Sequence, residues 1–231
     1  MTGERTAQPD VHSAEPVTQR RSMLCIVVLL PALSFLTPFL GLTFCLHSQA
    51  TPWGSRLFDF AGMALRFGIF PLLPTLLASL VLLFPKSTRI AGMCLLIAAV
   101  AYILGSGMGL QSGHSLRMGQ FDKLVERSAP LVRAVHGYVE DTGHPPESLH
   151  VLVPDRLQKI PTTGMRLYPE FEYFVGEDAR EWEGNPWILR LHTPVSFLNW
   201  DQLLYFPLQG YPDTGYSGRL ERIGEWAYVH E

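Results

Sequence analysis

The sequence predicts an α+β protein in which three transmembrane helices precede a water-soluble domain, where a long helix packs on a small antiparallel sheet. Three observations support this prediction. Residues 22–110 are mostly apolar, and residues 116–141 repeat apolar side chains at spacings of three and four, as one face of a helix does. Beyond residue 169, short runs of aromatic and β-branched residues alternate with turn-forming residues. Because the helix and the strands are segregated along the chain, an α+β layer is expected.

Three apolar segments are long enough to cross a bilayer, whose hydrocarbon core of about 30 Å needs roughly 20 helical residues. The predicted spans are residues 22–46, 67–84 and 90–110. Prolines in the first two spans do not exclude them, because neighbouring helices can satisfy the backbone groups that a proline frees. Residues 1–21 are predicted to form a disordered cytoplasmic N-terminus. A cleaved signal peptide ending at the small residues 48–50 is the alternative for the first span, although two further spans follow it.

The positive charges beside the spans predict the orientation of the chain. Tandem arginines at 20–21 precede the first span, and Lys86 and Arg89 lie in the turn between the second and third spans. The intervening loop "HSQATPWGSR", residues 47–56, carries only Arg56. Since lysine and arginine favour the cytoplasmic side, the N-terminus is expected in the cytoplasm and residues 111–231 are expected outside it.

Two charged residues, Asp59 and Arg66, lie at the outer end of the second predicted span. A charge inside a membrane is costly and is a functional candidate by default, but side chains at this depth can reach the interface. The two residues are seven positions apart and share a helical face. We interpret them as an interfacial ion pair or as two separately solvated charges.

The composition of the C-terminal half excludes two classes of site. Residues 114–231 contain 11 basic and 17 acidic residues, a net charge of −6, which argues against nucleic acid as a partner. All three cysteines lie in the apolar segments, so the soluble domain can contain neither a disulfide framework nor a cysteine metal site.

A glycine-rich stretch, residues 105–115, crosses from the end of the third predicted span into the soluble domain. It allows either close helix packing or a flexible exit from the membrane. In the amphipathic helix that follows, Pro130 is expected to kink the helix or to start a new one. Gly143 is a helix-stop residue. The proline-rich residues 143–161 are interpreted as a packed joint between the helix and the sheet. Four strands are then predicted, at residues 170–176, 187–193, 202–208 and 225–231.

The order of these elements resembles the type IV pilins and the pseudopilins of type II secretion over roughly residues 90–231. An apolar helix, an amphipathic continuation and aromatic strands follow one another. The pattern Tyr138–x₄–Gly143–x–Pro145, followed by the apolar pairs at 149 and 152–153, contributes most of the resemblance. It implies a bacterial inner-membrane protein and a pilin-like shape for the exported domain.

The chain departs from the pilin pattern at its processing site. Pilin precursors are cut after a glycine just before the apolar helix and have a glutamate at the fifth mature position. The sequence "PKSTRIAGMCLLIAAV" offers no glutamate, and two further spans precede it. A pilin-like domain that stays on its membrane anchor is therefore expected. The calcium site of major pseudopilins is not expected, because the late loop "YPDTGYSGR" has only Asp213 as a carboxylate.

No motif in the soluble domain predicts catalysis, a cofactor or a metal. Its histidines include no HxxxH or HExxH pair, its serines lack a glycine-flanked elbow, and the acidic run at 176–183 is interpreted as a solvated hairpin. These histidines, interpreted as surface or capping residues, are His114, His136, His144, His150, His192 and His230. We expect that the protein is not an enzyme.

Aromatic residues are abundant in the small soluble domain, where most are expected in the core. If some share an exposed face, they would bind a partner protein or stack on sugars. The candidates for this interaction face are Trp187, Trp200, Trp226 and Tyr228. The predicted function is a membrane-anchored structural or protein-interaction component of the cell envelope, with membrane lipid and an envelope protein as partners. The alternative is an extracytoplasmic ligand- or glycan-binding sensory domain that uses the aromatic face.

Overall fold

The computed structural model describes residues 15–195, 199–213 and 218–230, with side chains described from residue 26 onward. The chain divides into two compact units. One, called here the helical unit, comprises Met1–Phe39 and Gly68–Gly107. The other, called the sheet unit, comprises Leu40–Phe67 and Met108–Glu231. The protein is therefore α+β, as the sequence predicts.

Three helical segments are long and apolar enough to cross a membrane. They are Ile26–Gln49 in helix α1 (Glu15–Gln49), Arg56–Leu82, and Arg89–Thr142, which is helix α4. The first two segments overlap the predicted spans 22–46 and 67–84, and the third contains the predicted span 90–110. The helices α1 and α4 each contribute residues to both units.

The N-terminal region differs from its prediction. Helix α1 begins at Glu15, so residues 15–21 are helical and the prediction of disorder for them is wrong. Pro16 occupies the first turn, where a missing N–H costs no hydrogen bond. Residues 1–14 lie outside the described part of the chain.

The second apolar segment is not one continuous helix over residues 67–84. Helix α2 (Arg56–Phe67) ends before a turn at 68–71, and helix α3 (Leu72–Leu82) follows. The interruption coincides with Pro71, because the residue before a proline is disfavoured in helical geometry. Pro74 lies in the first turn of α3, where a proline is tolerated.

Helix α4 runs without interruption through the glycine-rich residues 105–115 and through Pro130, so it neither opens into a flexible exit nor restarts. Two of its glycines allow close packing. A Cβ atom on Gly105 would lie 2.3 Å from the carbonyl oxygen of Phe35, within the helical unit. In the sheet unit, a Cβ atom on Gly113 would lie 2.8 Å from the Cβ of Leu46. Of the two interpretations of the glycine run, close helix packing is confirmed at these positions.

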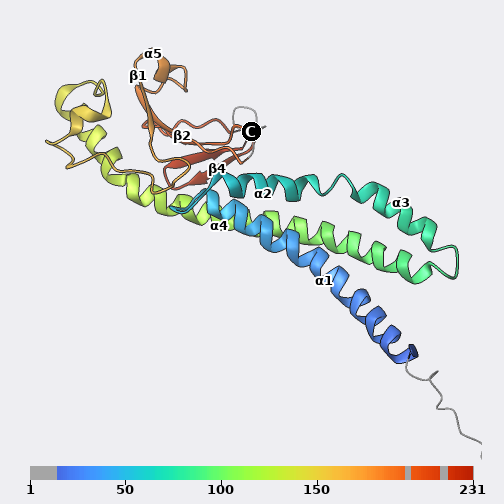
Figure 1. Ribbon diagram of the computed structural model, residues 1–231. Coiled ribbons are helices and arrows are strands. Elements are labelled where there is room, and N and C mark those ends of the chain that lie inside the picture. Colours follow the sequence, from blue (N-terminus) through green and yellow to red (C-terminus); the bar gives the residue numbers. More distant parts are fainter. Residues whose placement is uncertain (1–14, 196–198, 214–217, 231) are drawn as a thin grey trace, which may run out of the picture. The chain divides into compact units, whose positions relative to one another are not determined.

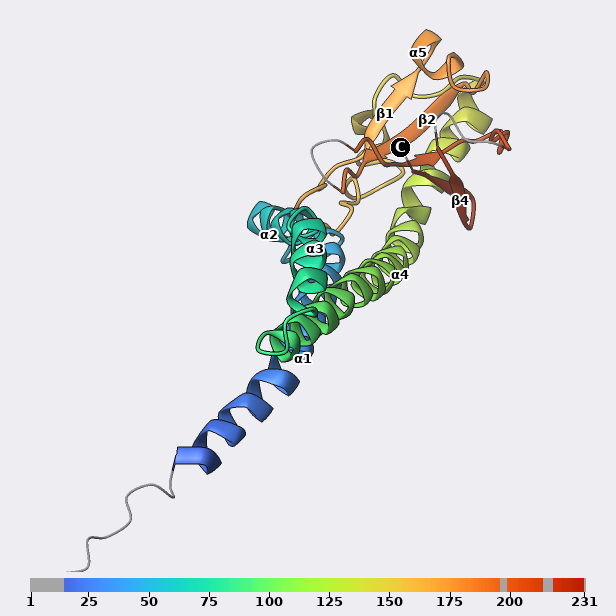
Figure 2. The same ribbon diagram turned by 90° about the vertical axis from the view of Figure 1, so that its right-hand side faces the viewer.

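The sheet has five antiparallel strands in the order β1-β2-β3-β5-β4 and lies along the later part of α4 (Figures 1 and 2). The strands are β1 (Glu172–Val175), β2 (Trp187–His192), β3 (Gln202–Tyr205), β4 (Leu220–Ile223) and β5 (Trp226–Val229). Four of them fall within the predicted ranges, although Glu231, at the end of the last range, lies outside the described residues.

Strand β4 is not among the predicted strands, because it is a four-residue strand of mixed polarity at the edge of the sheet. It joins β5 through the two-residue turn Gly224-Glu225, with Ile223 paired to Trp226. Gly224 has a φ of +58° at the first central position, where a type II′ hairpin turn favours glycine.

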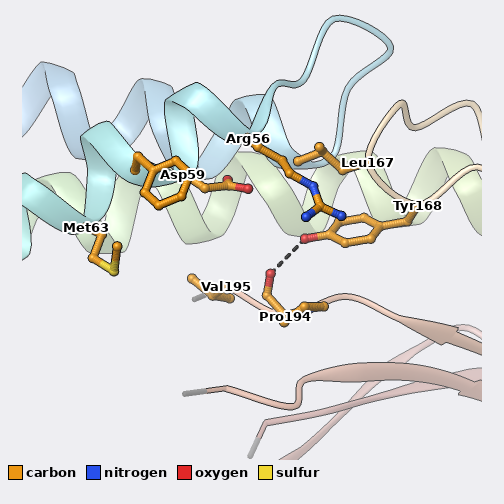
Figure 3. A pocket seen from close by; sticks show the side chains of 8 residues that line it. Arg56, Asp59, Met63, Leu167, Tyr168, Pro194 and Val195 are labelled. Atoms are coloured by element: carbon orange, nitrogen blue, oxygen red, sulfur yellow. Dashed lines mark hydrogen bonds between the residues drawn. The ribbon is translucent and has the colours of Figure 1, made fainter. Parts of the chain in front are cut away.

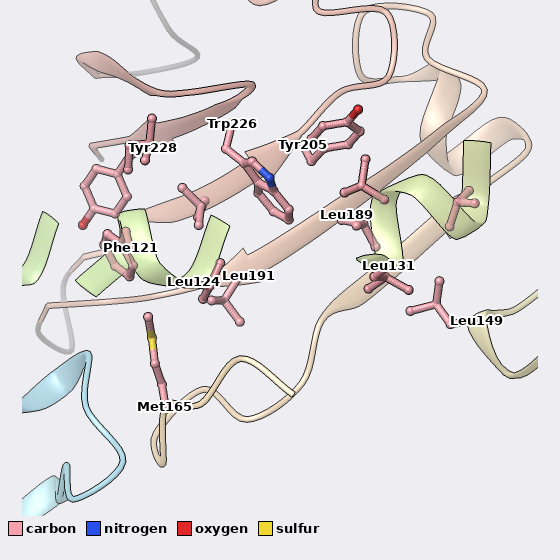
Figure 4. Packing of buried hydrophobic residues seen from close by; sticks show 14 of the residues in the cluster. Phe121, Leu124, Leu131, Leu149, Met165, Leu189, Leu191, Tyr205, Trp226 and Tyr228 are labelled. Carbon is pink, nitrogen blue, oxygen red and sulfur yellow. The ribbon is translucent and has the colours of Figure 1, made fainter. Parts of the chain in front are cut away.

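Two apolar clusters cover the two faces of the sheet. On one face, alternate strand residues such as Leu189, Leu191 and Tyr228 pack against Phe121 and Leu131 of α4 (Figure 4). On the other face, Ile188, Leu204 and Val229 pack with Phe206 and Ala179, a residue of the short helix α5 (Glu177–Arg180). This alternation is what a sheet buried on both faces requires.

The proline-rich connector is a packed joint, as predicted. Helix α4 ends at Thr142, and Gly143 follows with a φ of +79°. The connector then forms the 3₁₀ turn η2 (Leu149–Leu152), whose two end residues are buried in the main cluster. Leu157 packs against the same cluster. The connector thus closes one end of the layer between helix and sheet.

Candidate functional site

The four aromatic residues predicted to form an interaction face lie in two different places. Trp187, Trp226 and Tyr228 are core residues with exposed fractions of 1%, 2% and 0%, whereas Trp200 is 56% exposed. The hypothesis of an exposed face is therefore wrong for the first three. Strand alternation directs them toward α4, where burial of their large apolar area stabilises the fold.

Trp200 borders a hollow of about 270 Å³, called here the outer-face hollow. Its strand residues lie on the face of the sheet opposite α4, because they alternate with the residues that pack on that helix. The hollow is lined by Glu172, Trp182, Arg190, His192, Trp200 and Gln202. It combines two indole rings with side chains of both charges.

Arg190 is the central charged group of the outer-face hollow. Its Nε donates a hydrogen bond of 2.6 Å to Oε2 of Glu172 on the neighbouring strand. Its guanidinium lies 4.5 Å from the ring centre of Phe174 and 5.9 Å from that of Trp182. Held by these contacts, Arg190 and Glu172 present a fixed donor and acceptor beside Trp200. Such a surface can hold an aromatic or apolar group flanked by polar atoms.

A second hollow of about 270 Å³ lies between α2 and two loops of the sheet unit (Figure 3). Arg56 and Asp59 come from α2, while Tyr168 and Val195 come from the loops. The Tyr168 hydroxyl donates to the carbonyl oxygen of Pro194 at 2.7 Å, and burial raises the pKa of Tyr168 to about 12. The phenol is therefore neutral at physiological pH and serves to fasten one loop to the other.

Of the two interpretations of Asp59 and Arg66, the ion pair between them is not formed in the described part of the chain. Nε2 of Gln49 donates to Oδ1 of Asp59 at 2.8 Å and to the carbonyl oxygen of Val195 at 3.2 Å. Arg66 Nη1 lies 3.5 Å from the same Val195 oxygen. Asp59 and Arg66 are thus both linked to the segment that follows β2, Asp59 through Gln49 and Arg66 directly.

A third hollow, of about 410 Å³, opens beside the connector and is lined in part by Leu149, Ile160 and Phe171. Tyr173 at its edge donates its hydroxyl hydrogen to the carbonyl oxygen of Pro146 at 2.9 Å. That bond ties the connector to β1. The polar contact at this hollow therefore has a structural role in the joint.

A buried charged network joins α4 to the sheet. Arg117 is 1% exposed, and its two terminal nitrogens donate to the Tyr228 hydroxyl and to the carbonyl oxygen of Thr193. The Tyr228 hydroxyl donates in turn to Oδ2 of Asp201, which lies 3.9 Å from Arg117 Nη1. The Arg117 guanidinium also lies 5.1 Å from the ring centre of Phe121. Burial raises the pKa of Tyr228, so its hydroxyl keeps its proton and acts as a donor.

Arg117 is not among the residues predicted to be functional, although the sequence contains a signal for it. Arg117 lies four and seven residues before Phe121 and Leu124, on the apolar stripe of the helix. A charge on such a stripe needs a buried partner. The partner could not be identified from the sequence, because Asp201 and Tyr228 lie more than 80 residues further along the chain.

The histidines interpreted as surface or capping residues have different surroundings. His144, His150 and His192 are exposed. His136 is partly buried, with its Nε2 3.0 Å from the Tyr205 hydroxyl and its ring 5.2 Å from that of Trp187. The interpretation is therefore wrong for His136, which packs inside the sheet unit.

The acidic run at 176–183, interpreted as a solvated hairpin, contains helix α5 between the paired strands β1 and β2.

Comparisons of the chain with protein-family models, with curated proteins and with solved structures find no match.

Proposed function

We propose that the chain is a multi-pass protein of the bacterial inner membrane. Its exported C-terminal domain, residues 111–231, binds another protein of the cell envelope. The three helical segments of sufficient length and hydropathy support membrane insertion. The positive flanks support a cytoplasmic N-terminus and an exported C-terminal domain. The acidic character of residues 114–231 is consistent with a protein partner.

The observation that carries this proposal is the exposure of Trp200 beside the outer-face hollow. Tryptophan is enriched among the residues that dominate binding energy at protein interfaces. Trp200 leaves 56% of its surface exposed, and a bound partner would bury this apolar area. The neighbouring Arg190–Glu172 pair would orient the partner, since a fixed donor and acceptor favour one register of a bound segment.

Replacing Trp200 with alanine is expected to reduce recovery of the partner after crosslinking in cells and purification in detergent. The loss is expected to reach at least tenfold, because truncating a hot-spot residue costs about 2 kcal/mol or more. Thermal stability should change little, since the side chain is largely exposed.

The matched control is Leu208→Ala, which removes another exposed apolar side chain, 60% exposed, from the sheet unit. Leu208 does not line the outer-face hollow, so its removal should leave partner recovery unchanged. Equal recovery with wild type and Trp200→Ala would exclude Trp200 from the interface. Equal loss with both variants would indicate non-specific adhesion of apolar surface.

The orientation is tested by fusing reporters to the full-length protein. Alkaline phosphatase fused after Glu231 is expected to be active, and a fluorescent protein inserted in the turn at 85–89 is expected to fluoresce. Phosphatase activity requires export, and the fluorescent protein requires the cytoplasm. An inactive phosphatase at the C-terminus would mean that the domain is cytoplasmic and that the envelope function is wrong.

A second candidate function is glycan binding, which is favoured by the composition of the same hollow. Trp182 and Trp200 both line it, next to carboxylate, guanidinium and amide groups. Indole faces stack on sugar rings, while such polar groups bind hydroxyls. The two candidates separate by thermal unfolding: cell-wall glycans would raise the melting temperature of wild type but not of Trp200→Ala under the second candidate. If the protein-binding candidate is right, cell-wall glycans would leave the melting temperatures of wild type and of Trp200→Ala unchanged.

The pilin-like shape remains part of the proposal. A long helix lying on one face of an antiparallel sheet supports it, as does the helix stop at Gly143 before a packed connector. The absence of a glutamate from "PKSTRIAGMCLLIAAV" favours permanent anchoring over release into a filament.

A further inference from the structure

Three side chains of metal-ligand type meet at one edge of the sheet unit. His114 projects from α4, Glu221 from the edge strand β4, and His230 from the position directly after β5. One ligand atom from each lies within 4.8 Å of the others. All three residues are partly exposed, so an ion can reach them from solvent. The proposed function uses none of these residues.

The distances between the ligand atoms fit a shared ion. Two ligands of one tetrahedral zinc ion, each bound at about 2.1 Å, lie about 3.4 Å apart. Oε2 of Glu221 lies 3.3 Å from Nε2 of His230 and 3.7 Å from Nε2 of His114. The two histidines therefore direct the same ring nitrogen toward one carboxylate oxygen, with their ring centres 5.4 Å apart.

The backbone holds two of the three residues in place. Glu221 is paired with Tyr228 across the β4–β5 ladder, and the His230 N–H donates to the carbonyl oxygen of Arg219 at 2.9 Å. The His230 ring also stands edge-on to the Tyr228 ring, with centres 4.6 Å apart. Little ordering would therefore be needed when an ion binds, which favours affinity.

The buried network fixes the third residue. His114 lies one helical turn before Arg117, whose side chain is bonded to Tyr228 and to Thr193. This anchors the turn of α4 that carries His114 against β5. The positive charge of Arg117 would repel a cation, but Asp201, 3.9 Å away, offsets it.

We propose that His114, Glu221 and His230 form a zinc site that fastens α4 to the β4–β5 edge. Two imidazoles and one carboxylate are a ligand set that suits zinc, and three protein ligands leave a fourth position for water or a partner's side chain. The site would lock the edge strand, which otherwise has a neighbour on only one side.

The sequence contains no recognisable metal motif, because the three ligands come from separate segments. Zinc motifs recognisable in a sequence place two ligands within a few residues on one element. Here 107 positions separate His114 from Glu221, and only the hairpin brings Glu221 to His230. Their juxtaposition depends on the packing of α4 along β5.

The test is zinc binding by the full-length protein in detergent, purified through a tag without histidine or cysteine and stripped with EDTA. Titration against a fluorescent zinc chelator is expected to give one zinc per chain. The double variant His114→Ala/His230→Ala is expected to bind at least about 100-fold more weakly, since loss of even an indirect partner costs about 10–100-fold. Glu221→Gln, which keeps the side-chain shape, is expected to weaken binding as well.

His150→Ala is the matched control, because it removes an exposed histidine of η2. This variant should still bind one zinc ion per chain. All variants retain the three cysteines, so zinc bound by thiols would persist in the double variant. Zinc should also raise the melting temperature of wild type and of His150→Ala, but not of the double variant. Equal zinc affinity in wild type and the double variant, or no zinc binding by a folded wild type, would overturn the proposal.

Discussion

Replacing Arg117 with methionine is expected to lower the free energy of unfolding by about 3–5 kcal/mol, because breaking a buried ion pair leaves an uncompensated buried charge. Asp201 is 4% exposed and would lose its positive neighbour. The carbonyl oxygen of Thr193 would lose the donor that Arg117 supplies. Thermal unfolding of the full-length protein in detergent, followed by tryptophan fluorescence, should show a melting temperature lower by about 10 °C or more.

The control for Arg117→Met is the double variant Arg117→Met/Asp201→Asn. Removing both charges leaves no unpaired ion in the core, so part of the lost stability should return. Asparagine at position 201 has a single accepting oxygen, which can accept from the Tyr228 hydroxyl in place of Oδ2. The bond from Asn199 Nδ2 to the other oxygen would then be lost, so the recovery should be incomplete. The single variant Asp201→Asn is measured as well. If the loss of unfolding free energy in the double variant equalled the sum of the losses in Arg117→Met and Asp201→Asn, the two residues would not interact. An unchanged melting temperature for Arg117→Met would show that the network does not stabilise the fold.

Replacing Trp226 with alanine is expected to cost about 3–5 kcal/mol, the usual range for deleting a buried indole. Trp226 is 2% exposed and lies opposite Tyr205 in the β3–β5 register. Its ring centre is 5.3 Å from that of Tyr205 and 5.9 Å from that of Phe171. The cavity would open between α4 and the sheet, where neither element can collapse without breaking strand pairing. Urea unfolding of the full-length protein in detergent measures this loss.

Trp200→Ala provides the comparison for Trp226→Ala, since the same atoms are removed from an exposed position. Its effect should stay within about 0.5 kcal/mol. Trp226→Phe, which keeps an aromatic ring in the core, should lose less than Trp226→Ala. Equal destabilisation by Trp200→Ala and Trp226→Ala would contradict the assignment of one residue to the surface and the other to the core.

Much of the fold follows from local patterns. The stop at Gly143 and the helix before it were predicted because helical spacing and a glycine after the last apolar turn are properties of neighbouring residues. Four strands were predicted because runs of aromatic and β-branched residues between turn formers are also local properties of the chain. The second apolar segment was predicted less well, because hydropathy locates a span but does not reveal that Pro71 separates two helices. Strand β4 was missed because an edge strand of mixed polarity carries no burial signal.

The candidate site was predicted only in small part. Of four aromatic residues proposed for an interaction face, Trp200 is exposed and the other three are buried. Trp187 shares a strand face with Leu189, and Trp226 shares one with Tyr228, as the alternation of side chains along a strand requires. Which face meets α4 depends on how the helix docks, and that is not encoded in the period of a single strand.

The sequence by itself determined the α+β class, the three apolar segments and the long amphipathic helix, because each follows from the spacing of apolar residues along a short stretch. Only the tertiary structure decided which aromatic rings are buried. It also brought Arg117 to Tyr228 across 111 positions, and His114 to Glu221 and His230. These groups meet because α4 packs along β5, and side chains that meet through packing leave no spacing pattern in the chain.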